Sequence, residues 1–248
     1  MLKGQYRFLA ANSEEITVST SNVSLTPSDN HKLINVLRAD IGMQLNIICR
    51  STGKVFLARL CSTNPEVKIE ILSLISTTTP SRHAHRALMA LCKGEKNDFI
   101  CQKATELGVD HLCFFQAERS ISRIGEQDRK KKLERWQKIS AAALQQSGQS
   151  NMPSIEIFTS LNQALHAIPE RECVLFGMQS GKNLLEAELP TGPVSFIIGP
   201  EGGLSPKENE LLELHGAIPV TLGPATLRAE TAFILTLGCL NLRLQQIQ

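Results

Sequence analysis

The sequence predicts an α/β protein with a mostly parallel sheet, preceded by a smaller domain of β-strands. From residue 86 onward, short apolar runs alternate with segments of helical period, as in parallel strands joined by helices. Residues 1–74 instead show short strands broken by polar turns, with one helix among them, which favours a small β-barrel. A chain of 248 residues is long enough for two domains. We therefore predict domains at residues 1–74 and 75–248, with the polar stretch 76–81 at their junction.

In the first domain, the elements follow from periodicity and turn residues. Strands are expected at residues 6–10, 17–19, 45–49, 55–60 and 67–72. The last one alternates apolar and polar residues, so one of its faces should be buried. A helix should begin with Ser28 or Asp29 as its N-cap and end before Gly42.

In the second domain, strands and helices alternate. Strands are expected at residues 86–92, 111–115, 155–158, 173–176, 194–198 and 220–222. Helices are expected at residues 97–107, 129–146 and 230 to the end. Gly108 should end the first of these helices in a left-handed conformation. A further helix should begin at Ser205 as N-cap, with Pro206 at its first position and Glu208 completing a capping box.

Composition and charge exclude several classes of protein. With 42% apolar and 20% charged residues, the chain is not a disordered one. The start of the chain does not resemble a signal peptide, and the most apolar run, 231–242, is shorter than a membrane span. Seven cysteines are scattered without the spacing of a zinc or redox pair, so we expect reduced core thiols, no metal, no membrane and a cytoplasmic location.

The net charge of +2 is unevenly distributed. Lys and Arg exceed Asp and Glu by seven in residues 1–138, whereas the acidic residues exceed the basic ones by five in residues 139–248. This asymmetry indicates a front region that faces a polyanion, although an ordinary solvated surface would show the same counts.

Three predicted strands end in glycine-containing loops, at residues 176–181, 198–205 and 222–231. Ligands of open α/β sheets bind beyond the carboxyl ends of strands. The middle loop holds Gly199, Gly202 and Gly203, whose missing side chains allow the backbone to approach a ligand closely. Walker and dinucleotide-binding fingerprints are absent. A single loop of this kind could be a plain structural turn. Two successive loops, each with a Gly-Pro pair directly after a strand, favour a binding site.

These loops resemble those of a known family. Ile198-Gly199-Pro200-Glu201-Gly202-Gly203, Leu222-Gly223-Pro224 and Leu227-Arg228-Ala229-Glu230-Thr231-Ala232 are similar to motifs of the RsmE family of SPOUT methyltransferases. Further similar segments lie along nearly the whole chain, namely Lys93-Gly94-Glu95-Lys96, Gln102-Lys103-Ala104-Thr105-Glu106-Leu107-Gly108, Glu134-Arg135-Trp136-Gln137-Lys138-Ile139, His31 and Val36-Leu37-Arg38.

The resemblance implies a fold, an activity and partners. It implies a SPOUT-type sheet with a C-terminal trefoil knot, a PUA-like β-barrel in front, and a homodimer. It also implies methylation of N3 of one uridine in 16S rRNA of the small ribosomal subunit, with S-adenosyl-L-methionine as cofactor. A knot runs against the general expectation for chain threading, so no periodicity in the sequence predicts it.

The resemblance and the loops together assign residues of the cofactor site. We expect contacts from Phe176, Gly177, Met178, Ile198, Gly199, Pro200, Glu201, Gly202, Gly203, Leu222, Gly223, Leu227 and Thr231. Arg228 is the candidate for stabilising the uracil N3 anion, or it forms a salt bridge with Glu230 or Glu201 instead. Glu230 is a candidate proton acceptor, or a partner of its helix dipole.

A second set of residues is predicted to contact RNA: Arg7, His31, Arg38, Lys93, Lys96, Gln102, Lys103, Arg119 and Gln146. The alternatives are a structural role for His31 and a solvated helix face with an internal ion pair for Gln102, Lys103 and Glu106.

The sequence departs from the family pattern at three positions. The family usually has basic residues where Ala225 and Gln149 stand, and a glutamate in place of Gln145. These departures leave open a non-catalytic RNA-binding protein or one that methylates a ribose 2′-hydroxyl. A nucleotide-binding enzyme unrelated to methylation is the third alternative, which the missing phosphate motifs disfavour.

Overall fold

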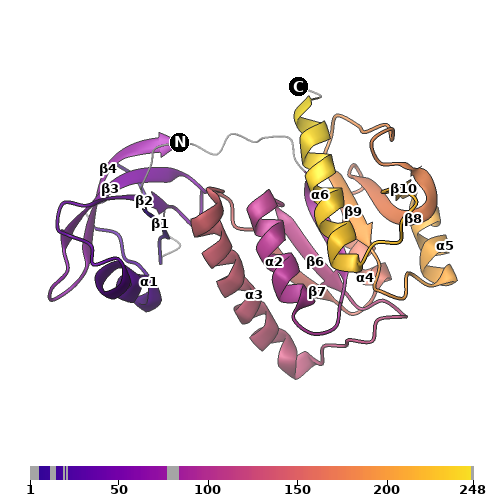
Figure 1. Ribbon diagram of the computed structural model, residues 1–248, viewed down its shortest axis with the longest axis horizontal. Coiled ribbons are helices and arrows are strands. Elements are labelled where there is room, and N and C mark those ends of the chain that lie inside the picture. The colour runs from indigo at the N-terminus through magenta and orange to yellow at the C-terminus, as the bar shows by residue number, and fades with distance from the viewer. Residues whose placement is uncertain (1–5, 12–14, 19, 21, 77–83, 247–248) are drawn as a thin grey trace. The chain divides into compact units, whose positions relative to one another are not determined.

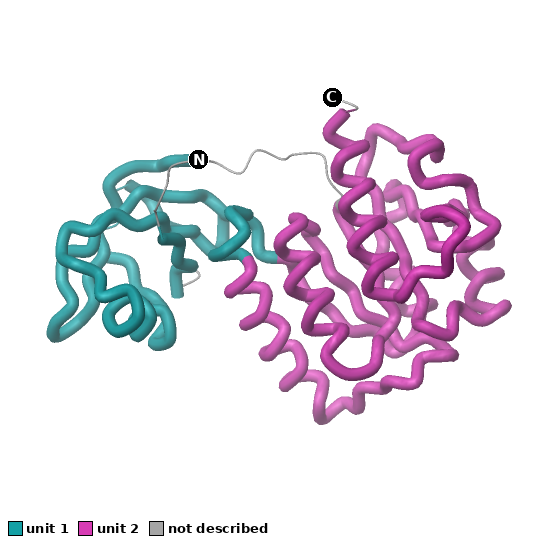
Figure 2. The backbone as a smooth tube through the Cα atoms, viewed as in Figure 1, with its two compact units in different colours: residues 1–80, 144–152 teal, residues 81–143, 153–248 magenta. Residues whose placement is uncertain are grey.

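The computed structural model describes residues 6–11, 15–18, 20, 22–76 and 84–246. The chain forms two compact units (Figure 2). Unit 1 comprises residues 1–80 and 144–152, and unit 2 comprises residues 81–143 and 153–248. Each unit is described by itself.

Unit 1 is built on a four-stranded sheet in the order β1-β2-β3-β4. Its strands are β1 (Tyr6–Leu9), β2 (Gln44–Ile48), β3 (Val55–Ser62) and β4 (Lys68–Ser76). β1 pairs in parallel with β2, and the other two pairings are antiparallel. Ile69 and Ile71 of β4 are buried, which confirms the predicted apolar face. They pack in one core with Phe8, Leu33, Leu45, Ile47, Phe56 and Leu60.

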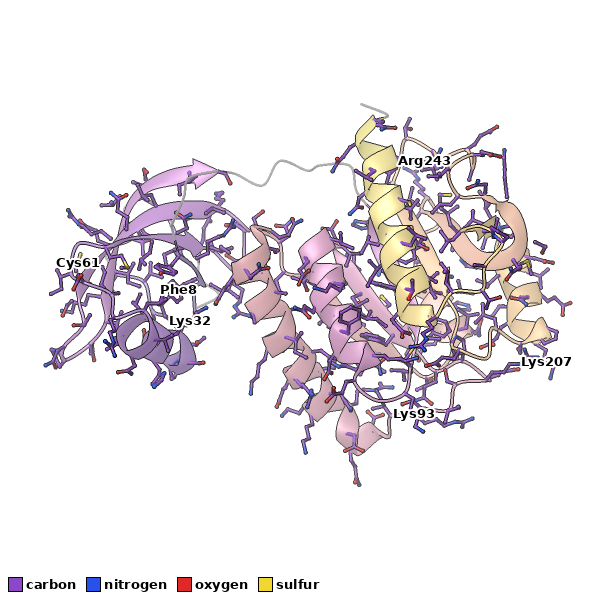
Figure 3. All side chains as sticks on the ribbon, viewed as in Figure 1. Phe8, Lys32, Cys61, Lys93, Lys207 and Arg243 are labelled. Carbon is purple, nitrogen blue, oxygen red and sulfur yellow. The ribbon has the colours of Figure 1, made fainter. Side chains whose placement is uncertain are left out.

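The helix of unit 1 begins earlier than predicted. α1 (Pro27–His31) has Thr26 as its N-cap, whose side chain accepts a hydrogen bond from the backbone of Asp29. The prediction of Ser28 or Asp29 as N-cap was wrong because Pro27, which has no N–H and a fixed φ, already occupies the first helical position. The chain continues as a π-helix, η1 (Lys32–Val36), and the ammonium of Lys32 lies 5.8 Å from the ring centroid of Phe8 (Figure 3).

The strand predicted at residues 17–19 is not formed by the described part of that segment. The backbone N–H of Thr17 donates to the hydroxyl of Thr20 at 3.0 Å, and the N–H of Thr20 donates to the carbonyl of Thr17 at 3.0 Å. This turn satisfies the backbone locally, where a strand would need a partner. Ser19 lies outside the described residues.

Unit 2 is built on a six-stranded sheet in the order β10-β8-β9-β5-β6-β7. The strands are β5 (Ala84–Ala90), β6 (His111–Phe115), β7 (Ser154–Phe158), β8 (Cys173–Asn183), β9 (Val194–Ile198) and β10 (Ile218–Thr221). Every pairing between them is parallel. The predicted α/β class with a mostly parallel sheet is thus confirmed.

Helices cover both faces of this sheet (Figure 1). One face packs against α2 (Lys96–Leu107), α3 (Glu126–Ser147) and α6 (Ala229–Gln246), and the other against α4 (Leu161–His166) and α5 (Pro206–Leu214). Fully buried Trp136 of α3 stacks at 4.3 Å on Phe114, and its indole N–H donates to Asp98 of α2. The last turn of α3, residues 144–147, is counted with unit 1.

The predicted helix ends of unit 2 are confirmed in two places. Ser205 caps α5, Pro206 is its first residue, and Glu208 completes the capping box. Gly108 ends α2 with φ +83°, a conformation that residues other than glycine rarely adopt. Ser205 thus marks the end of the loop before α5, and Gly108 marks the start of the loop after α2.

β8 differs from its prediction, because the glycine segment 176–181 was expected to be a loop after a strand ending at Phe176. The strand instead runs on to Asn183 with a large bulge: Pro219 of β10 pairs with Phe176, whereas the next residue, Val220, pairs with Lys182. Residues 177–181 therefore bulge out of the sheet. Gly181 returns so close to β10 that a Cβ there would lie 2.5 Å from the backbone nitrogen of Val220.

All seven cysteines are free, but they are not all core residues. Cys49, Cys92, Cys101 and Cys113 are buried, whereas Cys61 is exposed on β3, and the other two are intermediate. The prediction of core thiols was wrong for Cys61, which lies on the outer side of an alternating strand. Within the described ranges, no helix combines the length and apolar character that crossing a bilayer would require.

Candidate active site

A cavity of about 340 Å³ opens at the carboxyl ends of β9 and β10 and at the bulge of β8, the strand between them in the sheet. This volume is in the range of small-molecule sites. The three loops predicted from the sequence line it together, with residues Gly177, Met178, Gln179, Ile198, Gly199, Pro200, Glu201, Gly203, Leu204, Asn209, Val220, Thr221, Leu222, Gly223, Ala225, Thr226, Leu227, Ala229 and Ala232.

Glycines at the cavity are required by conformation and by space. Gly203 and Gly223 have φ values of +70° and +119°, which side chains disfavour. A Cβ on Gly199 would lie 3.0 Å from Cγ of Leu204 and 3.2 Å from its backbone nitrogen. At its glycines, the wall of the cavity therefore consists of bare backbone, which offers amides and carbonyls to a ligand.

The loop after β9 is braced from two sides. The buried carboxylate of Glu208 accepts hydrogen bonds from the backbone of Ser205 at 2.8 Å and of Glu118 at 3.0 Å. Arg119 donates to the carbonyls of Gly202 and Leu204 at 3.3 and 3.4 Å. The turn after β6 thus supports the glycine loop, a role for Arg119 that the sequence prediction of an RNA contact did not foresee.

Lys96 links two segments at the cavity, the loop after β9 and the first turn of α6. The ammonium of Lys96 lies 2.7 Å from a carboxylate oxygen of Glu201 and 3.2 Å from one of Glu230. Burial opposes ionisation of Glu201, but hydrogen bonds from Lys96 and from backbone amides outweigh it and lower the pKa of this carboxyl. The hydrogen bonds that its ammonium donates to Glu201 and Glu230 raise the pKa of Lys96. Glu201 and Lys96 are therefore both charged at neutral pH.

Arg228 stands at the rim of the cavity. It immediately precedes α6, its side chain is exposed, and its neighbours Leu227 and Ala229 both line the cavity. The salt bridge to Glu230 or Glu201 that the sequence left open is not formed, because both carboxylates pair with Lys96. Its guanidinium makes no ion pair with any described residue, so it can face a ligand or substrate.

Ten of the thirteen residues predicted for the cofactor site line the cavity. Phe176 is fully buried in the core on the α4 and α5 side of the sheet. At Gly202 a Cβ would contact Arg119, and Thr231 is exposed on α6. The cavity is also lined by nine residues that were not predicted from the sequence: Gln179, Leu204, Asn209, Val220, Thr221, Ala225, Thr226, Ala229 and Ala232.

The missed residues had weak signals or none in the sequence. Ala225, Thr226 and Ala229 lie inside the predicted third loop, so its whole length could have been included. Asn209 faces the cavity from the first turn of α5, and nothing in a capped amphipathic helix distinguishes such a residue.

The lining suits a nucleoside-like ligand. Ile198, Leu204, Leu222 and Leu227 supply apolar surface for a flat ring. Backbone amides and carbonyls of the glycine loops, with the side chains of Gln179, Asn209, Thr221 and Thr226, offer hydrogen bonds to ring edges and hydroxyls. In the described part of the chain, no group of three His, Cys, Asp or Glu side chains is placed to hold a metal ion.

The predicted RNA-contact residues divide into two groups. Arg7 donates to the carbonyls of Gly148 and Gln149 at 2.8 and 2.9 Å, after the end of α3, and Lys103 pairs with Glu106 at 2.8 Å. With Lys96 and Arg119, these cations are bound within the protein. His31, Arg38, Lys93, Gln102 and Gln146 are exposed, and Arg38 has an unusual φ of +49° for a residue other than glycine.

Comparison with known proteins places these loops in a family. A model of the RNA methyltransferase domain matches residues 79–241, which include all three cavity loops. The chain is 32% identical over 229 residues to the ribosomal RNA small subunit methyltransferase E of Bacillus subtilis, covering 88% of this chain and 89% of that protein. The chain belongs to the ribosomal RNA small subunit methyltransferase E family.

Other members of this family match the chain over a similar extent. The methyltransferase E of Mesomycoplasma hyopneumoniae is 29% identical, covering 94% of this chain and 97% of that protein. The crystal structure of the methyltransferase E of Neisseria gonorrhoeae, bound to S-adenosyl methionine, is 28% identical with a TM-score of 0.85, covering 98% of each chain. Both units of this chain therefore fall within the region shared with the family.

Proposed function

We propose that this chain transfers a methyl group from S-adenosylmethionine to N3 of a uridine in 16S rRNA of the small ribosomal subunit. The observation that carries the proposal is the cavity of about 340 Å³ that lies among the bulge of β8 and the glycine loops at the carboxyl ends of β9 and β10. It lies within the region matched by the RNA methyltransferase model, and a family member at 28% identity has been crystallised with S-adenosyl methionine.

The residues of the cavity fit this cofactor. An adenine ring needs apolar surface on its faces and hydrogen-bonding groups at its edge, and the leucines and bare backbone of the loops provide both. The ribose hydroxyls match the polar side chains of the lining. Glu201 lines the same cavity and is ionised, so its charge favours a cationic ligand.

S-adenosylmethionine supplies an electrophilic methyl group when bound. The three loops hold and orient it, because an in-line displacement depends chiefly on the alignment of donor and acceptor. Uracil N3 must lose its proton to become a good nucleophile, and the resulting negative charge spreads over two carbonyl oxygens. Arg228, charged and exposed at the rim, is suited to donate hydrogen bonds to one of these oxygens and stabilise the anion.

The identity of the proton acceptor is a separate question. Glu230 was predicted for this role, and its carboxylate lies 3.2 Å from the ammonium of Lys96. This carboxylate is thus already engaged in an ion pair within the protein. Arg228 is therefore the catalytic residue of the proposal, and N3 gives its proton to solvent water.

The proposal includes the finer points that the family resemblance implies. A trefoil knot rests on the family resemblance alone and stays a prediction. A PUA-like barrel is supported by the four strands of unit 1 around one apolar core. A homodimer rests on the resemblance alone, and a cytoplasmic location rests on the scattered cysteines of the sequence; both stay predictions.

Labelled methyl transfer tests the activity. The purified protein is incubated with S-adenosylmethionine labelled in its methyl group and with small subunits from a strain that lacks this enzyme, and the RNA is digested to nucleosides. The label is expected in 3-methyluridine, with no transfer to subunits from the parent strain, which already carry the modification. Label in a 2′-O-methyl nucleoside would overturn the position proposed. A protein that binds S-adenosylhomocysteine but transfers no methyl to any subunit would indicate the non-catalytic alternative.

A further inference from the structure

We infer that Lys96 is a positioning residue that ties together two walls of the cofactor cavity and does not contact RNA. This inference rests on the proposed function, because it concerns how the same cavity is held ready for S-adenosylmethionine. It replaces the role of a phosphate contact that the sequence indicated for Lys96.

The backbone that carries Lys96 is held firmly. Lys96 is the first residue of α2, in the connection that follows β5. The buried side chain of Asn97 accepts a hydrogen bond from the backbone N–H of Cys92 at 3.0 Å and donates to its carbonyl at 2.8 Å. Gly94, between them, has a φ of +70°, so the turn that presents the lysine needs a glycine.

The two partners of Lys96 belong to two different loops of the cavity. Glu201 is in the glycine loop after β9 and itself lines the cavity. Glu230 is in the first turn of α6, directly after the third loop, whose residues 225–227 and 229 line the cavity. Lys96 thus connects two segments nearly thirty residues apart in the sequence.

Such a connection matters because these two loops, although Glu208 and Arg119 brace the one after β9, are not joined to each other by those bonds. Their glycines have more conformational freedom than other residues and provide no side chains for packing. The positive φ of Gly203 and Gly223 gives turns that glycine adopts without strain, so these backbone angles do not by themselves hold the loops in place. Two ion pairs from one ammonium fix the separation of the two loops in the free protein. Less conformational entropy is therefore lost when the cofactor binds.

The charges at Lys96 argue against a phosphate contact. Two carboxylates lie within 3.2 Å of its ammonium, so the group of three has a net charge of −1 and would repel a phosphate. Lys93 offers a comparison three residues away. Its side chain is exposed and forms no ion pair with a described residue, as expected of a cation that can meet RNA.

The experiment measures cofactor affinity without RNA. Lys96→Met, Lys96→Arg and the matched control Lys93→Met are titrated with S-adenosylhomocysteine by calorimetry, and thermal unfolding checks that each protein is folded. Lys96→Met is expected to bind about three- to tenfold more weakly than the unsubstituted protein, the range for two partly exposed ion pairs. Lys96→Arg should restore most of the affinity, and Lys93→Met should bind like the unsubstituted protein.

Steady-state kinetics and a double-mutant cycle distinguish a positioning role of Lys96 from other roles. Lys96→Met should raise KM for S-adenosylmethionine with little change in kcat, whereas Lys93→Met should raise KM for RNA. When Glu201→Gln is already present, adding Lys96→Met should lower the affinity for S-adenosylhomocysteine by a smaller factor, because the Lys96–Glu201 ion pair is already weakened. Unchanged affinity of Lys96→Met for S-adenosylhomocysteine, with weakened RNA binding, would overturn the inference. If the unsubstituted protein binds no S-adenosylhomocysteine, the proposed function fails instead.

Discussion

Replacing Gly181 with alanine tests whether the tight crossing of β8 and β10 builds the cofactor cavity. The added Cβ would lie 2.5 Å from the backbone nitrogen of Val220, and 2.6 and 2.7 Å from the carbonyl carbon and oxygen of Pro219. Ordinary contacts of a methyl group are well above 3 Å, and these neighbours are backbone atoms that cannot rotate away. The strands must therefore move apart.

The size of the effect follows from this geometry. An extra methyl group in a packed region usually costs 1–3 kcal/mol, and contacts with backbone on three atoms place Gly181→Ala near the upper end, at about 3 kcal/mol. For a chain of this size, that cost lowers the melting temperature by about 6–12 °C. Val220 and Thr221 of β10 line the cavity opposite Met178 of β8, so the affinity for S-adenosylhomocysteine should fall by about tenfold or more.

Gly192→Ala is the matched control, because its Cβ would have only the carbonyl oxygen of Arg171 nearby, at 4.0 Å. Thermal unfolding and calorimetry with S-adenosylhomocysteine are run on both variants. The control should melt within about 2 °C of the unsubstituted protein, as do most surface substitutions, and should keep its cofactor affinity. If Gly181→Ala behaves like Gly192→Ala in both measurements, the crossing neither resists separation nor shapes the cavity.

Three further predictions follow from the site. Arg228→Ala should lower kcat for methyl transfer by about 10²-fold while calorimetry shows little change in S-adenosylhomocysteine affinity; equal losses would make it a cofactor residue. Arg119→Met should weaken S-adenosylhomocysteine binding by about two- to fivefold, because it removes two long hydrogen bonds to the glycine loop, whereas a loss confined to RNA binding would contradict this role. Because the pKa of Glu201 is lowered in the folded protein, its contribution to the loop is complete above the ordinary glutamate pKa of about 4.3 and is lost as the pH falls through the lower folded value. Binding titrations should show the contribution of Glu201 unchanged from pH 8 to about pH 5, and a decline that begins near pH 6 would point to another group.

The sequence predicted the local structure of unit 2 well because punctuation residues act within a few positions. Ser205, Pro206 and Glu208 specify the start of α5 through bonds across three residues, and Gly108 ends α2 through its own φ. The same logic found the three glycine loops. Their convergence on one cavity could be anticipated from the rule that ligands bind at the carboxyl ends of strands, but not from the loops themselves.

Features that depend on contacts between residues far apart along the chain could not be predicted from the sequence. The order β10-β8-β9 is set by pairings between strands up to about 45 residues apart, and no local pattern encodes it. The bulge in β8 arises because β10 pairs with Phe176 and then with Lys182. In the sequence, the glycines between these two residues predict a loop beyond the end of a strand. A segment that leaves the hydrogen-bonded ladder and rejoins it further on has the same local pattern.

The predicted cations show the same limitation at the level of single side chains. Arg7, Lys96, Lys103 and Arg119 were assigned to RNA, yet each has a carbonyl or carboxylate of this chain as its partner. A guanidinium or ammonium bonds protein oxygens and phosphate oxygens by the same chemistry, so residue type alone cannot tell them apart. The excess of seven positive charges in residues 1–138 therefore overstates the charge available to RNA, since these four cations also serve the fold. Among the cations predicted to contact RNA, Arg38 and Lys93 are exposed and without an internal partner in the described residues, and contacts with the polyanion are best sought there first.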